Sequence, residues 1–371
     1  MRRQEVDHVP CAAYFNPLTD PQRVGYRWQF PFGPSERERC EYCLEVLGID
    51  AFVTLSIPLE NPAPGVSATV WMEGDVIHKA YETPAGTLHG AVKYDESWPH
   101  GFDVPFFSDH LIGHAVKHWV EDERDVAALK YVLRAPTDRQ ALERLRFEAR
   151  EKKRLADRLR IPIIAACGMG LTGGMHLVGA EEICLMVVER PGVLHAWLEY
   201  EHGLNLRTIE LAAELGAHVI SRNGFYETGD FYSPKMLEAL LGRRLRGEAR
   251  AARELGLASA YTAHTGLMPI LEYLATLEFD CIFGPDIATH HMDPVQFRDR
   301  LADRFSFWTG PSSTHHIWKS ADATRQAVRL CFDVFGRRGL ILGPAVSVHS
   351  IMPWENALAM FDEWRKLSLF E

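Results

Sequence analysis

Short apolar runs alternate with helical patterns along most of this 371-residue chain, and this alternation restricts the fold more than any other feature. Parallel strands need a crossover connection, so an alternation of strands and helices predicts a parallel sheet. Eight such strands are the number that closes a (β/α)8 barrel. The eight runs cover residues 9–14, 50–55, 161–167, 217–221, 259–263, 280–283, 305–309 and 339–342.

The segments between the later runs carry helix signals at both ends. Apolar residues recur three or four positions apart, which places them on one face of a helix. Ser233 and Asp293 each stand before a proline, a combination typical of a helix start, and Ser320 offers a third cap. Several patterns end at a glycine, such as Gly256 and Gly336, where helices commonly terminate. The sequence therefore predicts an α/β fold, a (β/α)8 TIM barrel.

One segment, residues 57–135, interrupts the alternation after the second strand. Its strand-like runs are separated by turn sequences at residues 73–75 and 83–86. A loop rich in Pro, His and Phe follows, and a helix at residues 123–134 is expected to return the chain to the barrel. We therefore expect a single domain over residues 1–371, with a β-hairpin-containing insertion at 57–135.

The balance of charge excludes some classes of function. The chain has 50 Asp and Glu against 40 Lys and Arg, a formal net charge of −10, whereas nucleic-acid binding needs clustered excess cations. The basic run at 243–246 is interpreted as a solvated helix face. No stretch has the roughly 18 apolar residues of a membrane helix, and seven scattered cysteines do not suggest a disulfide framework. We expect a cytoplasmic protein that binds neither nucleic acid nor membranes.

The fourth apolar run ends in an unusual concentration of polar groups, all within residues 222–230. Barrel proteins carry their function where the carboxyl ends of the strands open into loops, so these groups are placed as a functional site would be. The predicted catalytic residues are Tyr226, Glu227, Asp230 and His264, and the predicted substrate-binding residues, also near strand ends, are Arg23, Tyr26, Arg27, Met169, His176, Asn223, Ser313 and His315.

Three strand-end residues also suggest a metal site. Glu227, His264 and His349 follow different strands toward one barrel mouth, and mixed carboxylate and imidazole groups suit zinc. We predict about one zinc ion per chain, held by these three ligands with a fourth position open. The alternative is structural: Glu227 pairs with Arg222 or caps the following helix, and His264 packs beneath the insertion.

Glycines follow the third strand with the spacing of a dinucleotide-binding fingerprint, at Gly168, Gly170 and Gly173. A Rossmann fold also needs an acidic residue about 20 positions further on that closes the next strand, whereas a long helical region follows here. We interpret the glycine loop as one that lets a bulky ligand approach the backbone. Cys40 and Cys43 fall in a strongly helical pattern, so their spacing is that of one helical turn.

Several motifs keep a fixed order along nearly the whole chain: RRQEVDHVP, ETPAGTL, EDERDVAALK, YSPKMLEALL, HTGLMPILEYLATLEFDCIFG and LILGPAVSVHSIMPWENALAMFDEW. Together they resemble the uroporphyrinogen decarboxylase superfamily, which also contains methyltransferases that pass methyl groups to or from cobalamin and thiols. The resemblance implies a single (β/α)8 barrel, often dimeric, so we expect a homodimer.

The chain departs from the motifs of both branches. True uroporphyrinogen decarboxylases carry Arg-x-Ala-Gly-Arg after the first strand and an Asp near the end of the second. Here the first loop reads NPLTDPQRVGYRWQFPFG, and the second strand ends in Ser56 without an Asp. The methyltransferases bind zinc through His-x-Cys-Gly after the fifth strand, where this chain has Thr265 at the Cys position and His264 one position away. A site with oxygen and nitrogen ligands would suit demethylation of an ether or amine, because the metal would polarise the leaving group.

The resemblance and its departures favour a methyltransferase that moves a methyl group between a small methylated substrate, such as a methoxylated aromatic, and a corrinoid carried by a partner protein. The alternative is a decarboxylase acting on a porphyrinogen-type or smaller acid. In that enzyme Arg23 or Arg27 would hold a carboxylate, and His264 or Asp230 would manage the proton. A third hypothesis is a ligand-binding barrel without catalysis.

Overall fold

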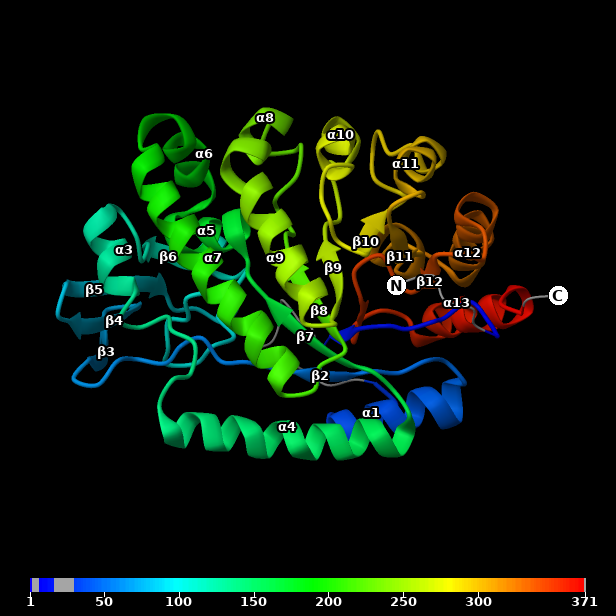
Figure 1. Ribbon diagram of the computed structural model, residues 1–371, viewed down its shortest axis with the longest axis horizontal. Coiled ribbons are helices and arrows are strands. Elements are labelled where there is room, and N and C mark those ends of the chain that lie inside the picture. The colour runs from blue at the N-terminus through cyan, green and yellow to red at the C-terminus, as the bar shows by residue number, and fades with distance from the viewer. Residues whose placement is uncertain (2–6, 17–29, 370–371) are drawn as a thin grey trace.

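The computed structural model describes residues 1, 7–16 and 30–369, and at its centre a seven-stranded parallel sheet curls around (Figure 1). Neighbouring strands follow the order β12-β11-β10-β9-β8-β7-β2. Sequential strands lie side by side, as expected when each is joined to the next by a short crossover. The strands are β2 (Val53–Leu55), β7 (Ile163–Cys167), β8 (Val219–Asn223), β9 (Ala258–Thr262), β10 (Cys281–Asp286), β11 (Ser306–Gly310) and β12 (Leu340–Leu342).

The first apolar run of the chain joins the two edges of this sheet. The backbone N–H of Ala12 donates to the carbonyl of Leu342 at 2.9 Å, and the N–H of Leu342 donates to the carbonyl of Pro10 at 2.7 Å. On the other side, the N–H of Asp50 donates to the carbonyl of Cys11 at 2.8 Å, just before β2 begins. The segment therefore stands between β12 and β2, and the TIM-like α/β barrel predicted from the alternation is confirmed.

Helices cover the outside of the sheet and begin where cap residues stand (Figure 1). Ser233, Asp293 and Ser320 are the N-caps of α8, α11 and α12, and each side-chain oxygen accepts a hydrogen bond from the first turn. Gly256 and Gly336 follow α9 and α12 with φ of 81° and 68°, a conformation that glycine adopts without strain. The helices are α1 (Glu36–Glu41), α4 (Arg139–Leu159), α5 (Gly170–Val178), α6 (Ala180–Glu189), α7 (Pro191–Glu214), α8 (Pro234–Leu237), α9 (Arg243–Glu254), α10 (Leu271–Leu274), α11 (Pro294–Leu301), α12 (Ala321–Phe335) and α13 (Trp354–Leu367), with shorter π-helical or 3-10 turns η1 (Tyr42–Leu47), η2 (Glu238–Gly242), η3 (Met268–Ile270) and η4 (Ser313–Ile317).

Between β2 and β7 the chain forms a second, antiparallel sheet of order β3-β4-β5-β6, at the left of Figure 1. Its first two hairpins turn at the predicted turn sequences, because Glu73 pairs with Val76 and Thr83 pairs with Gly86. The elements of this segment are β3 (Ser67–Glu73), β4 (Val76–Thr83), β5 (Gly86–Lys93), α2 (Leu111–His114), β6 (Ala115–Lys117) and α3 (Glu123–Leu129), and the short strands β1 (Phe15–Asn16) and β13 (Val348–His349) pair with each other elsewhere.

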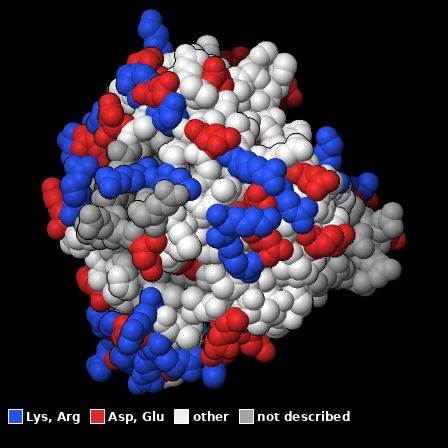
Figure 2. Space-filling model, turned by 90° about the vertical axis from the view of Figure 1, so that its right-hand side faces the viewer, with Lys and Arg blue, Asp and Glu red and all other residues white. Residues whose placement is uncertain are grey.

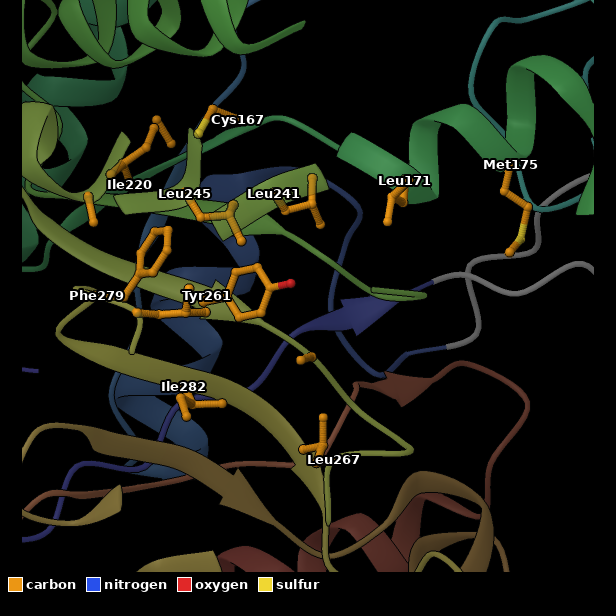
Figure 3. Close-up of a cluster of buried hydrophobic side chains, with 14 of the residues drawn as sticks. Cys167, Leu171, Met175, Ile220, Leu241, Leu245, Tyr261, Leu267, Phe279 and Ile282 are labelled. Atoms are coloured by element: carbon orange, nitrogen blue, oxygen red, sulfur yellow. The ribbon is translucent and has the colours of Figure 1, made fainter. Parts of the chain in front are cut away.

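Residues of the barrel strands alternate between the barrel interior and the surface that the helices cover. In β8, Val219 belongs to the inner buried cluster and Ile220 to the outer one, which Figure 3 shows in part. Arg222 is in phase with Ile220, so its side chain also leaves the sheet on the helix side. The inner cluster contains Ala12, Phe52, Ile164, Val219, Ala260, Cys281, Phe283 and Trp308.

The basic run at 243–246 lies on α9, and the interpretation that it is solvated is wrong for one residue. Arg244 is 8% exposed because it packs beneath α7 and pairs with Glu199 at 2.8 Å. Arg246 pairs with Glu238 at 2.6 Å. Over the face shown in Figure 2, many Lys and Arg side chains lie beside Asp and Glu side chains.

Among the described residues, no single helix is long and apolar enough to cross a membrane; α5 and α6 reach that length only as a pair bent by 108°. Cys40 and Cys43 are buried thiols without a disulfide, on the successive helical segments α1 and η1, so the helical explanation of their spacing is confirmed.

Candidate active site

The described barrel strands direct their carboxyl ends toward one mouth, where the predicted site residues were expected to meet. Arg222 departs from this arrangement because it lies under the helices. Its Nε is 3.0 Å from Oε2 of Glu248 on α9, and its Nη2 is 3.4 Å from Oε1 of Glu227 and 3.9 Å from Oε2 of Glu201 on α7. All four side chains are at most 6% exposed. One guanidinium therefore serves three buried carboxylates.

Glu227 is completely buried within this group. Its Oε2 accepts a hydrogen bond from the hydroxyl of Tyr261 at 2.7 Å, and its Oε1 accepts one from the backbone N–H of Leu171 at 2.9 Å. Burial raises the pKa of the Glu227 carboxyl to about 7, although Arg222 and the Tyr261 hydrogen bond act in the opposite direction. The structural alternative, in which Glu227 pairs with Arg222, is what the structure shows.

Carboxylates on the helix side of the sheet bind the backbone of the glycine loop after β7. Oε1 of Glu201 accepts the backbone N–H groups of Met169 at 2.7 Å and Gly170 at 3.0 Å. A Cβ on Gly168 would meet Arg222, and one on Gly170, whose φ is 48°, would meet Glu227. The glycines thus let buried charged side chains approach the backbone, and the prediction that the loop also lets a bulky ligand approach stays a prediction.

His264, directly after β9, is half-buried near the mouth. Its Nδ1 donates to the carbonyl of Gly284 at 2.8 Å, which leaves the lone pair of a neutral imidazole on Nε2. The ring stacks on Phe225 with centroids 5.4 Å apart. Burial lowers the pKa of His264, so the ring is neutral at pH 7 and its Nε2 can accept a proton or a hydrogen bond.

Tyr226 and His176 meet through a residue that sequence reasoning missed, Asp109. Oδ1 of Asp109 is 3.2 Å from Nε2 of His176 and accepts a hydrogen bond from the Tyr226 hydroxyl at 3.4 Å. The hydrogen bond from His176 lowers the pKa of Asp109, while burial and then Asp109 raise the pKa of Tyr226 to about 12. These contacts tie the segment between β2 and β7 to the loop after β8.

Asp230 is exposed and links two neighbouring loops. Its Oδ2 accepts a hydrogen bond from the hydroxyl of Thr265 at 2.7 Å, and the N–H of Gly229 donates to the carbonyl of Gly266 at 3.0 Å. The loops after β8 and β9 are therefore fixed to each other beside His264.

The remaining predicted residues are distributed around the rim. Ser313 is buried and donates to the carbonyl of Ser347 at 2.6 Å, while His315 in η4 is exposed. Nε2 of His349 lies 3.1 Å from the hydroxyl of Ser347. Asn223 and Met169 are half-buried at the ends of β8 and β7. Arg23, Tyr26 and Arg27 lie outside the described residues.

The residues predicted to bind zinc do not come together in the described part of the chain. No group of three or more His, Cys, Asp or Glu side chains in residues 7–16 and 30–369 is arranged to hold a metal ion. Both oxygens of Glu227 accept protein hydrogen bonds, and His264 and His349 contact other partners. These three side chains therefore do not fit a shared zinc site, and zinc binding stays a prediction.

Two cavities mark opposite ends of the barrel. The larger, about 430 Å³, lies among residues that precede the strands, such as Pro10, Asp50 and Pro162. It is therefore at the amino ends of the strands, whereas barrel enzymes have their active sites at the carboxyl ends. The smaller, about 150 Å³, lies at the ends of β7 and β8 and includes two predicted binding residues. It is lined by Ile57, Leu59, Phe107, Leu133, Ala166, Cys167, Gly168, Met169, Trp197, Glu201, Leu204, Thr208 and Asn223.

Glu201 and Glu248 were also missed, although the sequence holds a signal for them. Glu201 falls among Trp197, Leu204 and Thr208 on the buried stripe of α7, and Glu248 falls on that of α9. A carboxylate on an otherwise apolar stripe needs a buried partner, because an unpaired buried charge is costly. Asp109 carries no comparable signal, since it lies in an irregular loop.

Fold and strand-end groups together define a TIM-like α/β-barrel protein with its candidate site at the carboxyl ends of the strands. The model of the family described as Uroporphyrinogen decarboxylase (URO-D) matches residues 101–367. The chain belongs to this family, as the sequence resemblance predicted. No curated protein matches the chain significantly.

Solved structures give the same fold at low sequence identity. A methyltransferase from Methanosarcina mazei is 14% identical with a TM-score of 0.60, over 98% of this chain and 96% of that chain. A B12-independent methionine synthase from Shewanella sp. W3-18-1, in complex with selenomethionine, is 12% identical with a TM-score of 0.53, over 97% of this chain and 98% of that chain. Both alignments extend over almost the full length of each chain.

Proposed function

We propose that this protein transfers a methyl group between a small methylated substrate and a corrinoid carried by a partner protein. The observation that carries the proposal is the position of Arg222, which is neutralised under the helices and so cannot bind a substrate carboxylate in the mouth. The first three residues after each of the strands β2 and β7–β12 include no Lys or Arg. A polycarboxylate substrate needs several fixed cations, and these described strand ends offer none.

The groups that face the mouth suit an uncharged or cationic substrate. Phe225 and Tyr226 supply aromatic surface, and Asn223 supplies an amide that can donate and accept hydrogen bonds. His264, with its Nδ1 bound to Gly284, presents Nε2 as an acceptor that orients the substrate or takes up a proton. A corrinoid supplies a strong nucleophile for methyl groups when it is bound. Methyl transfer also agrees with the name of one structural neighbour, whereas the corrinoid acceptor comes from the family resemblance.

The test is a methyl-transfer assay with the full-length chain. We expect that a reduced corrinoid protein, incubated with this protein and a panel of methylated donors, develops the absorption spectrum of methylcobalt. The His264→Gln variant should be slower by about 100-fold, in the usual range for one acid–base group. The exposed His195→Gln variant on α7 is the matched control and should retain full activity. No spectral change over a broad donor panel would overturn the proposal.

Decarboxylation is the second candidate, because the matched family model carries that description. In that enzyme Arg23 or Arg27 would hold a carboxylate, and the Asp109–Tyr226 contact or His264 would handle the proton. Release of carbon dioxide from a panel of acids, abolished by Arg27→Ala, would favour this function over methyl transfer. Tight ligand binding without turnover of any donor or acid would instead favour a non-catalytic barrel.

A further inference from the structure

The cavity of about 150 Å³ beside the mouth has an unusual combination of lining groups. It reaches the mouth, since Ala166 is exposed and Asn223 is half-buried while both line it. Its volume is below that of a typical cavity for a complete ligand, so it is suited to one compact part of a substrate.

Two aromatic rings and one carboxylate dominate the chemistry of the cavity. The rings of Phe107 and Trp197 lie with centroids 6.3 Å apart at 39°. Glu201 is the carboxylate, and no lysine, arginine or histidine is among the described lining residues. Aromatic faces and a carboxylate together attract methylated ammonium groups, through the ring quadrupole and through charge. A neutral apolar group would gain no comparable electrostatic attraction from the buried carboxylate.

The surroundings of Glu201 leave this charge available. Its Oε1 is held by the N–H groups of Met169 and Gly170. Its Oε2 is 3.9 Å from Arg222, which lies closer to Glu227 and Glu248. The side chain of His202 pairs with Glu248, with Nδ1 2.8 Å from Oε1, and not with Glu201. The cation that balances Glu201 is therefore shared, and a ligand cation in the cavity would gain attraction without displacing a tight ion pair.

We propose that this cavity binds a methyl group carried on a positively charged nitrogen, so that the substrate is a quaternary ammonium compound. The inference rests on the proposed methyl transfer and adds the class of donor. In the transfer, the C–N bond breaks with its electron pair staying on nitrogen, and the acceptor's nucleophile supplies the pair for the new bond. The leaving group is a neutral tertiary amine, so no proton has to reach it.

The experiment compares choline with 3,3-dimethylbutan-1-ol, its uncharged carbon isostere, by calorimetry on the full chain. We expect choline to bind at least about tenfold more tightly, because the isostere lacks the charge that the rings and Glu201 attract. Equal affinities, or no binding of choline, would overturn the proposal.

Two variants locate the interaction, and a third is the control. Glu201→Gln and Phe107→Leu should each weaken choline binding by about tenfold, while leaving the isostere unchanged. Glu210→Gln removes an exposed carboxylate from the same helix, α7, and does not line the cavity, so it should change choline affinity by less than about twofold. An equal loss in all three variants would overturn the assignment to this cavity. Phe107 is half-buried in a loop, so its variant still tests the idea if Glu201→Gln does not fold.

Binding and turnover separate this inference from the proposed function. If choline binds as expected but no methyl group reaches a corrinoid protein from any donor, the proposed function fails and the cation site stands. If uncharged ethers are demethylated and choline does not bind, the cation site fails and the proposed function stands.

Discussion

The hydroxyl of Tyr261 donates a hydrogen bond to Oε2 of Glu227 at 2.7 Å, and both side chains are fully buried on the helix side of the sheet. The loop residue Glu227 therefore turns back toward the outside of β9. Together with Arg222, it forms part of the support on which the glycine loop of the mouth rests. Changes to this support should be visible as changes in stability.

The Glu227 carboxyl should make stability depend on pH. Its pKa is raised from 4.5 to about 7 by burial, so between those values the folded protein holds more protons here than the unfolded chain. This site's contribution to the free energy of unfolding therefore falls as the pH rises from 4.5 to 7, and is constant above that. Glu227→Gln stays neutral and should remove this site's contribution to the slope, which is measured by comparing the variant and the unsubstituted chain by urea denaturation at pH 5 and pH 8. The exposed Glu143→Gln variant should keep it, and an unchanged slope in Glu227→Gln would contradict the prediction.

Arg222→Met should be among the most destabilising single substitutions. It leaves Glu201, Glu227 and Glu248 buried without a guanidinium, and breaking a buried ion pair from one side costs about 3–5 kcal/mol. Urea denaturation at pH 7 measures the loss. Arg139→Met, which removes an exposed ion pair on α4, should cost less than about 1 kcal/mol. Similar losses in the two variants would refute the argument.

Gly170→Ala and Gly203→Ala should have opposite effects. An alanine at 170 would have to adopt φ of 48° and its Cβ would meet Glu227, so we expect a loss of at least about 2 kcal/mol. Gly203 lies inside α7 with no atom near its Cβ position, so alanine there should stabilise by about 0.5–1 kcal/mol. Thermal unfolding of both variants measures the difference, and a stable Gly170→Ala would show that the loop is free to move.

His264 should set the acid limb of the activity profile. Burial lowers its pKa below the ordinary value of 6.5, so the neutral ring persists to lower pH than for a solvated histidine. We expect the midpoint of the acid limb of kcat/KM to lie below pH 6.5. The decline should disappear in the residual activity of His264→Gln and persist in His195→Gln. A limb at or above pH 6.5 would show that another group controls it.

The sequence by itself determined the barrel and the position of its mouth. Strand and helix periods, cap residues such as Ser320 and terminal glycines such as Gly336 act over a few residues, because backbone hydrogen bonds and capping are local. The order of the motifs also placed the chain in its family. The sequence lacks the cysteine that the methyltransferase branch has after the fifth strand and the arginine motif that the decarboxylase branch has after the first. The strand-end rule also predicted that His264, Tyr226 and Asn223 lie at the carboxyl ends of strands, where the structure has them.

Only the tertiary structure decided which strand-end groups lie at the mouth and which lie beneath the helices. Glu227 was predicted to be a metal ligand in the mouth, but it is buried against Tyr261 and Arg222. Two of the three carboxylates that surround Arg222 come from α7 and α9, 21 and 26 residues away along the chain. No local sequence pattern shows how those helices pack. Asp109 likewise reaches Tyr226 across 117 residues. Side-chain partners of this kind are chosen by packing and by the cost of leaving a buried charge unpaired, and both exist only once the chain has folded.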